Sequence, residues 1–371
     1  MSLAGILDDL AVSELMDISK GATRQDVTRV LGLTRPLNMQ DLAVLLSPAA
    51  ARRLEDLAGK SRMLTLRHFG RVMSMYAPLY LSNECAQDCL YCGFRAPNKI
   101  VRRTLATNEA IREAMFIRER GIRHLLLVSG EHPGVWDTEQ LEDLIRELGP
   151  LFPSLSIEVK PLALADYLRL KRAGLDGLTL YQETYDRGLY DHVHKKGRKK
   201  NYDARLEAVE DGARAGLKRI GLGALLGLGN WKREVLALVA HVRYMERKYW
   251  RTFFAVSLPR MRYAQGAMNV PHALSDRDLA QVACALRIAL PRTGLVLSTR
   301  EPPGLRDGLA RLGITQMSAG SRTEPGGYMH PNAAGEQFQV EDHRSPAEVA
   351  KALKAQGYDP VFKDWDSVLN A

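Results

Sequence analysis

Three of the four cysteines of the chain lie within eight positions, at Cys85, Cys89 and Cys92. Thiols so closely grouped are typical of a metal or redox centre, because a disulfide framework would spread them along the chain. A closed zinc site takes four ligands, whereas an iron–sulfur cluster that is held by three thiolates keeps one iron open to an outside ligand. The Cys-x3-Cys-x2-Cys spacing therefore favours a 4Fe-4S cluster with one open position.

A zinc site is the alternative for these cysteines. The fourth cysteine, Cys284, lies in the apolar helical pattern "LAQVACALRIAL", which predicts a core position. His132, His192 and His194 could complete a site in principle. We expect the last two at the surface, because they adjoin a basic run.

That basic run, "HKKGRKK", contributes Lys195, Lys196, Arg198, Lys199 and Lys200 to a formal net charge of +9. Such a loop could bind phosphate or nucleic acid. No aromatic residue is interleaved for base stacking, so a solvated surface loop is favoured and no nucleic-acid partner is expected.

The composition of the 371-residue chain, 46% hydrophobic and 26% charged, is typical of a folded globular protein. The first residues are acidic where a secretory signal would be basic, and no apolar run reaches the ~18 residues that a membrane span needs. We therefore expect a cytoplasmic protein without a membrane partner, in a compartment that keeps the thiols reduced.

The elements that position the cysteines alternate in a regular way. Residues 1–70 show helical periodicity, and from residue 76 onward short apolar runs alternate with amphipathic helical patterns. The runs predict eight strands, at 76–83, 123–130, 155–162, 177–182, 219–227, 253–258, 295–300 and 314–320. Such strands are parallel and buried on both faces, which favours a TIM-type (β/α)8 barrel. A doubly wound open sheet is the alternative, but the Gly-rich turn that it carries after its first strand is not found in the sequence.

Three regions are expected: an N-terminal helical segment at 1–70 that caps the following fold, the barrel at 71–325, and a C-terminal extension at 326–371. The extension contains one helical pattern and an aromatic-acidic tail at 362–366. Barrel enzymes carry their functional groups at the C-terminal ends of the strands. The polar residues at the predicted ends are Asn83, Glu131, Glu158, Gln182, Glu183, Arg260, Arg300, Ser318 and Ser321.

The cysteine loop follows the first strand and has Tyr91 before its last cysteine, and it resembles the radical S-adenosylmethionine (SAM) superfamily. In that superfamily SAM chelates the open iron, and one electron splits it into methionine and a 5'-deoxyadenosyl radical. The resemblance implies a cofactor site made of Tyr91, Ser129, Gly130, Glu131, Glu158, Glu183, Arg205 and Gly221. Within it, Arg205 would pair with the SAM carboxylate and Gly221 would pass close to the adenine. The alternative for Arg205 is an arginine on a helix surface.

Seven segments in order, among them "LYLSNECAQDCLYCGF", "LLLVSGEHPG", "STREPPG" and "VFKDWDS", resemble the 2-iminoacetate synthase family, the tyrosine lyases of thiamine biosynthesis. This resemblance implies cleavage of the Cα–Cβ bond of L-tyrosine to 2-iminoacetate (dehydroglycine) and 4-cresol. It also implies that Arg300, with Ser318 or Ser321, holds the substrate carboxylate and that Tyr80 lies near the amine. The alternative for Arg300 is a structural salt bridge with Glu301 or a neighbour.

Two other functions stay open. One is a related lyase that acts on tryptophan or another small substrate, and the other is a metal-stabilised nucleic-acid-binding protein, which would not need the polar strand ends. The family resemblance implies a reductant such as flavodoxin and a thiazole synthase partner. No cysteine follows Cys284, so the second cluster of the related hydrogenase-maturation lyase is not expected.

Overall fold

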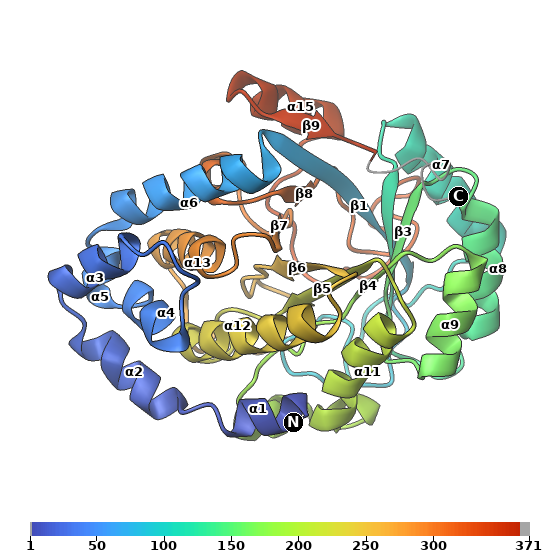
Figure 1. Ribbon diagram of the computed structural model, residues 1–371. Helices are drawn as coiled ribbons and strands as arrows, with labels where there is room; N and C mark the ends of the chain where they lie inside the picture. The colour runs from blue at the N-terminus through green and yellow to red at the C-terminus, as the bar shows by residue number, and fades with distance from the viewer. Residues whose placement is uncertain (1, 364–371) are drawn as a thin grey trace.

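The computed structural model describes residues 2–363 of the chain and contains a closed barrel of parallel strands. Strand β1 pairs with both β2 and β8, so that Ala77 lies opposite Leu125 and Ser74 opposite Gln316. This closure confirms the predicted barrel and excludes the open sheet (Figure 1). The barrel strands are β1 (Val72–Ser82), β2 (His124–Ser129), β3 (Ser154–Glu158), β4 (Gly177–Thr179), β5 (Arg219–Gly223), β6 (Phe253–Ser257), β7 (Gly294–Leu297) and β8 (Gln316–Ser318).

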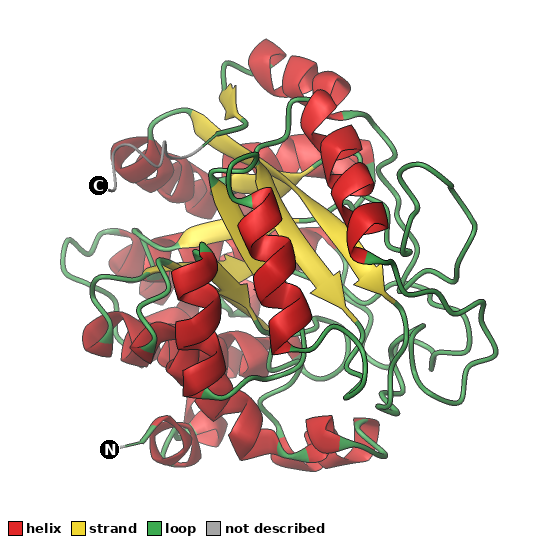
Figure 2. Ribbon diagram, turned by 90° about the vertical axis from the view of Figure 1, so that its right-hand side faces the viewer, coloured by secondary structure: helices red, strands yellow, loops and turns green. Residues whose placement is uncertain are grey.

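Helices follow the strands and surround the barrel, as Figure 2 shows from the side. Helix α13 begins with a capping box of Ser275 and Asp278, and α9 ends at Gly174, whose φ of 117° is left-handed. Their apolar faces and the strands form the main core. These helices are α7 (Thr107–Glu119), α8 (Thr138–Leu148), α9 (Leu164–Ala173), α10 (Arg187–Val193), α11 (Tyr202–Arg214), α12 (Trp231–Lys248), α13 (Asp276–Ala289) and α14 (Pro303–Leu309), with 3-10 turns at Arg198–Lys200 and Ala310–Leu312.

The N-terminal segment is helical, as predicted, and lies along one flank of the barrel. Helices α2 and α4 pack against α12, and α6 packs against α13 (Figure 1). The segment therefore covers the outer faces of these two barrel helices. Its helices are α1 (Leu3–Asp8), α2 (Val12–Gly21), α3 (Arg24–Leu31), α4 (Met39–Leu45), α5 (Pro48–Ala51) and α6 (Leu54–Phe69).

Beyond β8 the chain first runs over the barrel mouth and then rejoins the sheet. We call residues 335–342 the C-terminal strap. The strap contacts the cysteine loop, where the Gly93 amide donates to the Gln337 carbonyl (3.1 Å), and the end of β7, where the Asp342 amide donates to the Thr299 carbonyl (3.1 Å). Asp342 also forms a buried ion pair with Arg306 of α14. These contacts fix the strap across the mouth.

The final described elements are α15 (Pro346–Ala355), which is the predicted helix, and a ninth strand, β9 (Asp359–Val361). Strand β9 pairs with β1 outside the barrel, with Asp359 opposite Val72. The sequence did not predict it, because three residues with a central proline carry no strand pattern. Residues 364–366 of the predicted tail lie outside the described residues. Among the helices that the structure describes, none is long and apolar enough to cross a membrane.

Candidate active site

The cysteine loop leaves the end of β1 and has little regular structure, so other segments satisfy its backbone. The Asn83 side-chain amide donates to the carbonyls of Val101 (2.9 Å) and Gly335 (3.0 Å). The Leu90 amide donates to the Val193 carbonyl at 2.9 Å. The loop is thereby held in place from three parts of the chain, and Asn83 has a structural role.

The thiols of Cys85, Cys89 and Cys92 line one cavity, which we call the cysteine cavity. Burial raises the pKa of all three thiols, that of Cys92 to about 11. A buried thiol without a metal stays protonated, and metal binding displaces the proton. Three thiols at one cavity wall fit a cluster that the protein holds on one side.

Two of the remaining candidate zinc ligands, Cys284 and His194, have other surroundings. Cys284 is fully buried in the core, on α13. His194 is also buried, contrary to the expected surface position. Its Nδ1 lies 2.8 Å from the Tyr190 carbonyl and its Nε2 lies 2.8 Å from the Tyr91 hydroxyl. With the proton on Nδ1, both ring nitrogens are used within the protein.

The end of β2 packs tightly on the cysteine loop at Gly130. A Cβ at this position would lie 2.3 Å from the Glu84 carbonyl oxygen, so only glycine fits here. The hydroxyl of Ser129 donates to the Gly130 carbonyl at 3.1 Å. Both residues line the cysteine cavity, as expected for members of the predicted cofactor site.

In the same cavity as the thiols, two acidic and two basic side chains form a buried charge cluster. Arg205 Nη1 lies 2.9 Å from Glu131 Oε1, and Lys199 Nζ lies 2.7 Å from Glu183 Oε1. Burial opposes ionisation of Glu183, but the charges of Lys199 and Arg205 outweigh it and lower the pKa of that carboxyl. This cluster presents both signs of charge to the cavity.

The charge cluster corrects two interpretations. Arg205 is 5% exposed, so the alternative of a helix-surface arginine is wrong. Lys199 belongs to the basic run that was expected to be solvated, yet its side chain is only 10% exposed and lines the cysteine cavity. The other four cations of the run are exposed, as expected.

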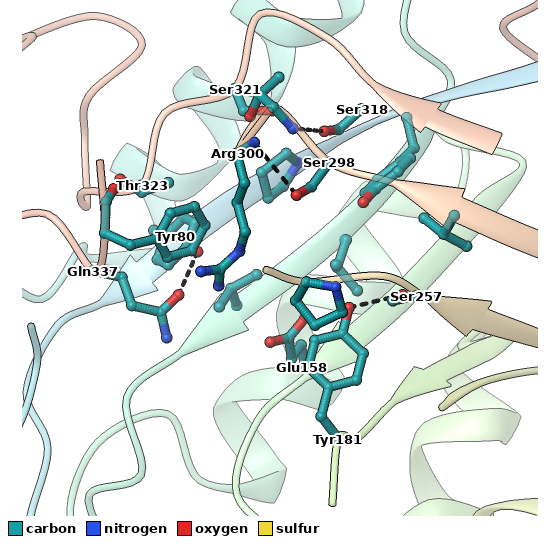
Figure 3. Close-up of a pocket in the computed structure, with 18 of the residues that line it drawn as sticks. Tyr80, Glu158, Tyr181, Ser257, Ser298, Arg300, Ser318, Ser321, Thr323 and Gln337 are labelled. Atoms are coloured by element: carbon teal, nitrogen blue, oxygen red, sulfur yellow. Dashed lines mark hydrogen bonds between the residues drawn. The ribbon is translucent and has the colours of Figure 1, made fainter. Parts of the chain in front are cut away.

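A second cavity, which we call the Arg300 cavity, adjoins the first and is shown in Figure 3. The Tyr80 hydroxyl donates to Gln337 Oε1 at 2.7 Å, and the Tyr181 hydroxyl donates to Ser257 Oγ at 2.9 Å. In Figure 3 the Arg300 guanidinium points into the cavity, between the Tyr80–Gln337 pair and Glu158. Four lining residues, Val128, Glu158, Tyr181 and Gln337, also line the cysteine cavity.

Within residues 2–363 Arg300 forms no ion pair with Glu301 or another neighbour, so the alternative of a structural salt bridge is wrong. Glu301 is fully buried and binds Arg260 and Arg262, the latter at 2.5 Å. Arg260 therefore has a structural role, although it was predicted at a functional strand end. The Arg300 guanidinium carbon lies 3.3 Å from the centre of the Phe338 ring instead, a cation–π contact that helps to hold the side chain in the cavity.

Two serines lie at the far side of this second cavity. Ser318 Oγ accepts a hydrogen bond from the Thr299 amide at 3.1 Å. Ser321 Oγ is buried and has no hydrogen-bond partner within residues 2–363. An orphaned buried hydroxyl is costly, so Ser321 is the serine that is available to a ligand.

The remaining predicted residues are placed as follows. Glu158 ends β3 between the two cavities, and Tyr91 lines a neighbouring cavity with Lys199 and Arg300. Gly221 lines a separate cavity deeper in the barrel with Thr179, so the structure does not bring it to the cysteines. Gln337 and Phe338 were missed, because neither a motif nor a strand end marks them.

Comparisons with known proteins are consistent with this geometry. Residues 79–242 match the Radical SAM superfamily, and residues 257–359 match the Biotin and Thiamin Synthesis associated domain. The 2-iminoacetate synthase of Escherichia coli (strain K12) is 44% identical over 350 residues, which cover 94% of this chain and 93% of that protein. The corresponding synthase of Salmonella typhimurium is 43% identical over the same shares.

A solved structure shares the whole fold. The FeFe-hydrogenase maturase HydG from Carboxydothermus hydrogenoformans is 34% identical with a TM-score of 0.90, and the match covers 98% of this chain and 85% of that chain. Methylornithine synthase, at 21% identity and a TM-score of 0.73, shares the fold alone.

Proposed function

The chain belongs to the 2-iminoacetate synthase family of the radical SAM superfamily. From this we propose that one of its two adjoining cavities binds the cofactors and the other binds the substrate. The chain is a radical SAM lyase that cleaves tyrosine in thiamine biosynthesis. One observation carries the proposal: Glu158, Tyr181 and Gln337 line both the cysteine cavity and the Arg300 cavity. A radical that is generated in one cavity can therefore meet a substrate that is held in the other.

We propose that the cysteine cavity binds the cofactors. Cys85, Cys89 and Cys92 would hold a 4Fe-4S cluster by three thiolates. The charge cluster of Glu131, Glu183, Arg205 and Lys199 offers partners of both signs to the zwitterionic end of SAM. When bound, the cluster and SAM supply the radical that starts the cleavage.

The Arg300 cavity is proposed to bind L-tyrosine. A guanidinium fork matches a carboxylate in two parallel hydrogen bonds, and the free hydroxyl of Ser321 adds a third partner. Tyr80 would face the substrate amine. Fixing both charged groups on Cα orients the Cα–Cβ bond, which selects the products 2-iminoacetate and 4-cresol. Tryptophan is the alternative substrate.

Two protein partners complete the proposal, a reductant such as flavodoxin and a thiazole synthase that consumes 2-iminoacetate. The backbone of Asp88, in the cysteine loop, is hydrogen-bonded to that of Lys195 and Lys196. These two lysines and Arg198 are exposed. An acidic electron donor would be attracted to this surface close to the cluster.

Replacing Arg300 with Ala tests the substrate site. Because a charge-assisted hydrogen-bonded pair is worth about 1.5–3 kcal/mol, we expect R300A to raise the KM for tyrosine roughly 10- to 100-fold. The iron and sulfide content of anaerobically reconstituted protein should stay near wild type. S321A should show a smaller change in the same direction.

Arg277→Ala is the matched control, since that guanidinium donates to the Ala51 carbonyl on the flank of the barrel. It should leave the KM unchanged. A loss of iron in R300A would assign Arg300 a structural role, and an unchanged KM would remove it from the substrate site.

A further inference from the structure

Gln337 occupies the junction of the two cavities and is held there by its backbone. Its amide donates to the Thr323 carbonyl (3.1 Å), and its carbonyl accepts from the Gly93 amide (3.1 Å). The side chain is partly buried and lines the cysteine cavity as well as the Arg300 cavity. Because both backbone groups are hydrogen-bonded, the position of the Gln337 Cα is fixed, and the side chain reaches its partners from there.

The two ends of the Gln337 side-chain amide face different cavities. Oε1 accepts the hydrogen bond from the Tyr80 hydroxyl at 2.7 Å (Figure 3). Nε2 lies 3.9 Å from Cys92 Sγ. With the oxygen held by Tyr80, the NH₂ group is directed to the sulfur.

We propose that Gln337 is a positioning residue that links the substrate contact Tyr80 to the cluster ligand Cys92 and favours reduction of the cluster. This inference rests on the proposed function, in which Cys92 binds iron. A thiolate accepts a stronger hydrogen bond than a neutral thiol does, so the contact with Nε2 should tighten when iron is bound. Hydrogen bonds to the sulfurs of a cluster tune its reduction potential. They raise it because the reduced cluster carries more negative charge.

Tyr80 has an indirect part in the same arrangement. Its hydroxyl fixes which end of the amide faces Cys92, and without it the amide can rotate away from the sulfur. A substrate amine that contacts Tyr80 would therefore change the hydrogen bond to Cys92. The reduction potential of the cluster should respond to the same residue that meets the substrate.

The test is a redox titration of the reconstituted protein, followed by the electron paramagnetic resonance signal of the reduced cluster, without SAM or tyrosine. Gln337→Met removes the donor at nearly constant volume. We expect the equilibrium constant for reduction to fall about tenfold, which is a shift of about 59 mV to more negative potential for one electron. Q337E keeps an acceptor for Tyr80 but adds negative charge, so its shift should be at least as large.

Tyr80→Phe should shift the potential in the same direction by less, and the Y80F/Q337M double variant should match Q337M, because both act through one contact. Gln339→Met is the control: Gln339 lies two positions further in the strap and is exposed. It should leave the potential unchanged.

The outcomes separate this inference from the proposed function. A wild-type protein that takes up no cluster would contradict the proposed function itself. A normal wild-type cluster with an unchanged potential in Q337M would overturn the role of Gln337 alone. If Q337M fails to take up iron, Q337E and Y80F decide, and unchanged potentials in both would overturn the inference.

Discussion

At the scale of single residues, Glu158 is an acid with a raised pKa at the junction of the two cavities. It ends β3 where the cavities meet. Burial is the main cause that raises the pKa of its carboxyl to about 7, the charge of Glu183 adds to the rise, and Arg300 opposes it. The carboxyl therefore changes its charge near neutral pH, next to the proposed substrate site.

Glu158→Gln tests this pKa through protein stability. An acid whose pKa is raised by folding stabilises the folded state below its ordinary pKa, and this stabilisation is lost as the pH rises to about 7. Relative to E158Q, the cluster-free wild type should therefore lose free energy of unfolding between pH 5 and pH 8. One pKa unit corresponds to about 1.4 kcal/mol, and solvent in the cavity reduces the effect, so we expect roughly 1–3 kcal/mol.

Urea unfolding at the two pH values measures this difference. Glu147→Gln, at an exposed position on α8, serves as control and should show the wild-type pH dependence. If E158Q also follows the wild-type curve, the carboxyl of Glu158 titrates in its ordinary range and the prediction is wrong.

Residue type and position at a strand end selected Glu158 and Arg300 from the sequence, spacing selected the cysteines, and the family resemblance selected Arg205, which lies on α11. None of these signals identified Lys199. Its partners Glu131 and Glu183 lie in other loops, and in the sequence it looks like its solvated neighbours. Gln337 lies 245 positions from Cys92 in the sequence. Neither its residue type nor a motif around it indicates a role in the site.

At the scale of elements, the contact between the end of β2 and the cysteine loop shapes the cofactor cavity. Gly130→Ala tests it, because the added Cβ would meet the Glu84 carbonyl oxygen at 2.3 Å. The loop must then move, at a cost of about 1–3 kcal/mol. We expect G130A to unfold at lower denaturant concentration and to bind less iron per chain after reconstitution.

Gly59→Ala is the matched control within α6, where the new methyl group meets nothing within 4 Å. Alanine in a helix is more favourable than glycine by about 0.5–1 kcal/mol, so G59A should be as stable as wild type or slightly more stable and keep its iron. A full complement of iron in G130A would show that the close approach at Gly130 is not needed for the cluster.

The strands of the barrel could be predicted because each one is a short apolar run that is followed by a helical pattern. Their C-terminal ends could not. The fourth and fifth predicted strands overran β4 (Gly177–Thr179) and β5 (Arg219–Gly223), since apolar residues continue into the loops that line the cavities. Isolated parallel bridges, Glu183 with Ala224 and Leu226 with Arg260, continue the pairing there without forming regular strand.

At the scale of the whole molecule, closure of the barrel brings together loops that are far apart in the sequence. The cysteines follow β1, Glu158 ends β3, Arg300 follows β7 and Ser321 follows β8. Eight alternating strand and helix patterns in the sequence were enough to predict that the barrel closes, and hence that the C-terminal ends of its strands lie close together. The path of the C-terminal strap was not predictable, because it has no apolar periodicity and is fixed by side-chain and backbone contacts such as the Arg306–Asp342 ion pair. The region boundaries at 70 and 325 stay predictions.

The central claim is that the cysteine cavity and the Arg300 cavity act together on tyrosine. The most direct measurement is the product analysis of anaerobically reconstituted wild-type protein with SAM, a strong reductant and either tyrosine or tryptophan. We predict that tyrosine yields 5'-deoxyadenosine and 4-cresol in equal amounts, and that tryptophan yields neither above background. Formation of 5'-deoxyadenosine without 4-cresol, or only with tryptophan, would contradict this account.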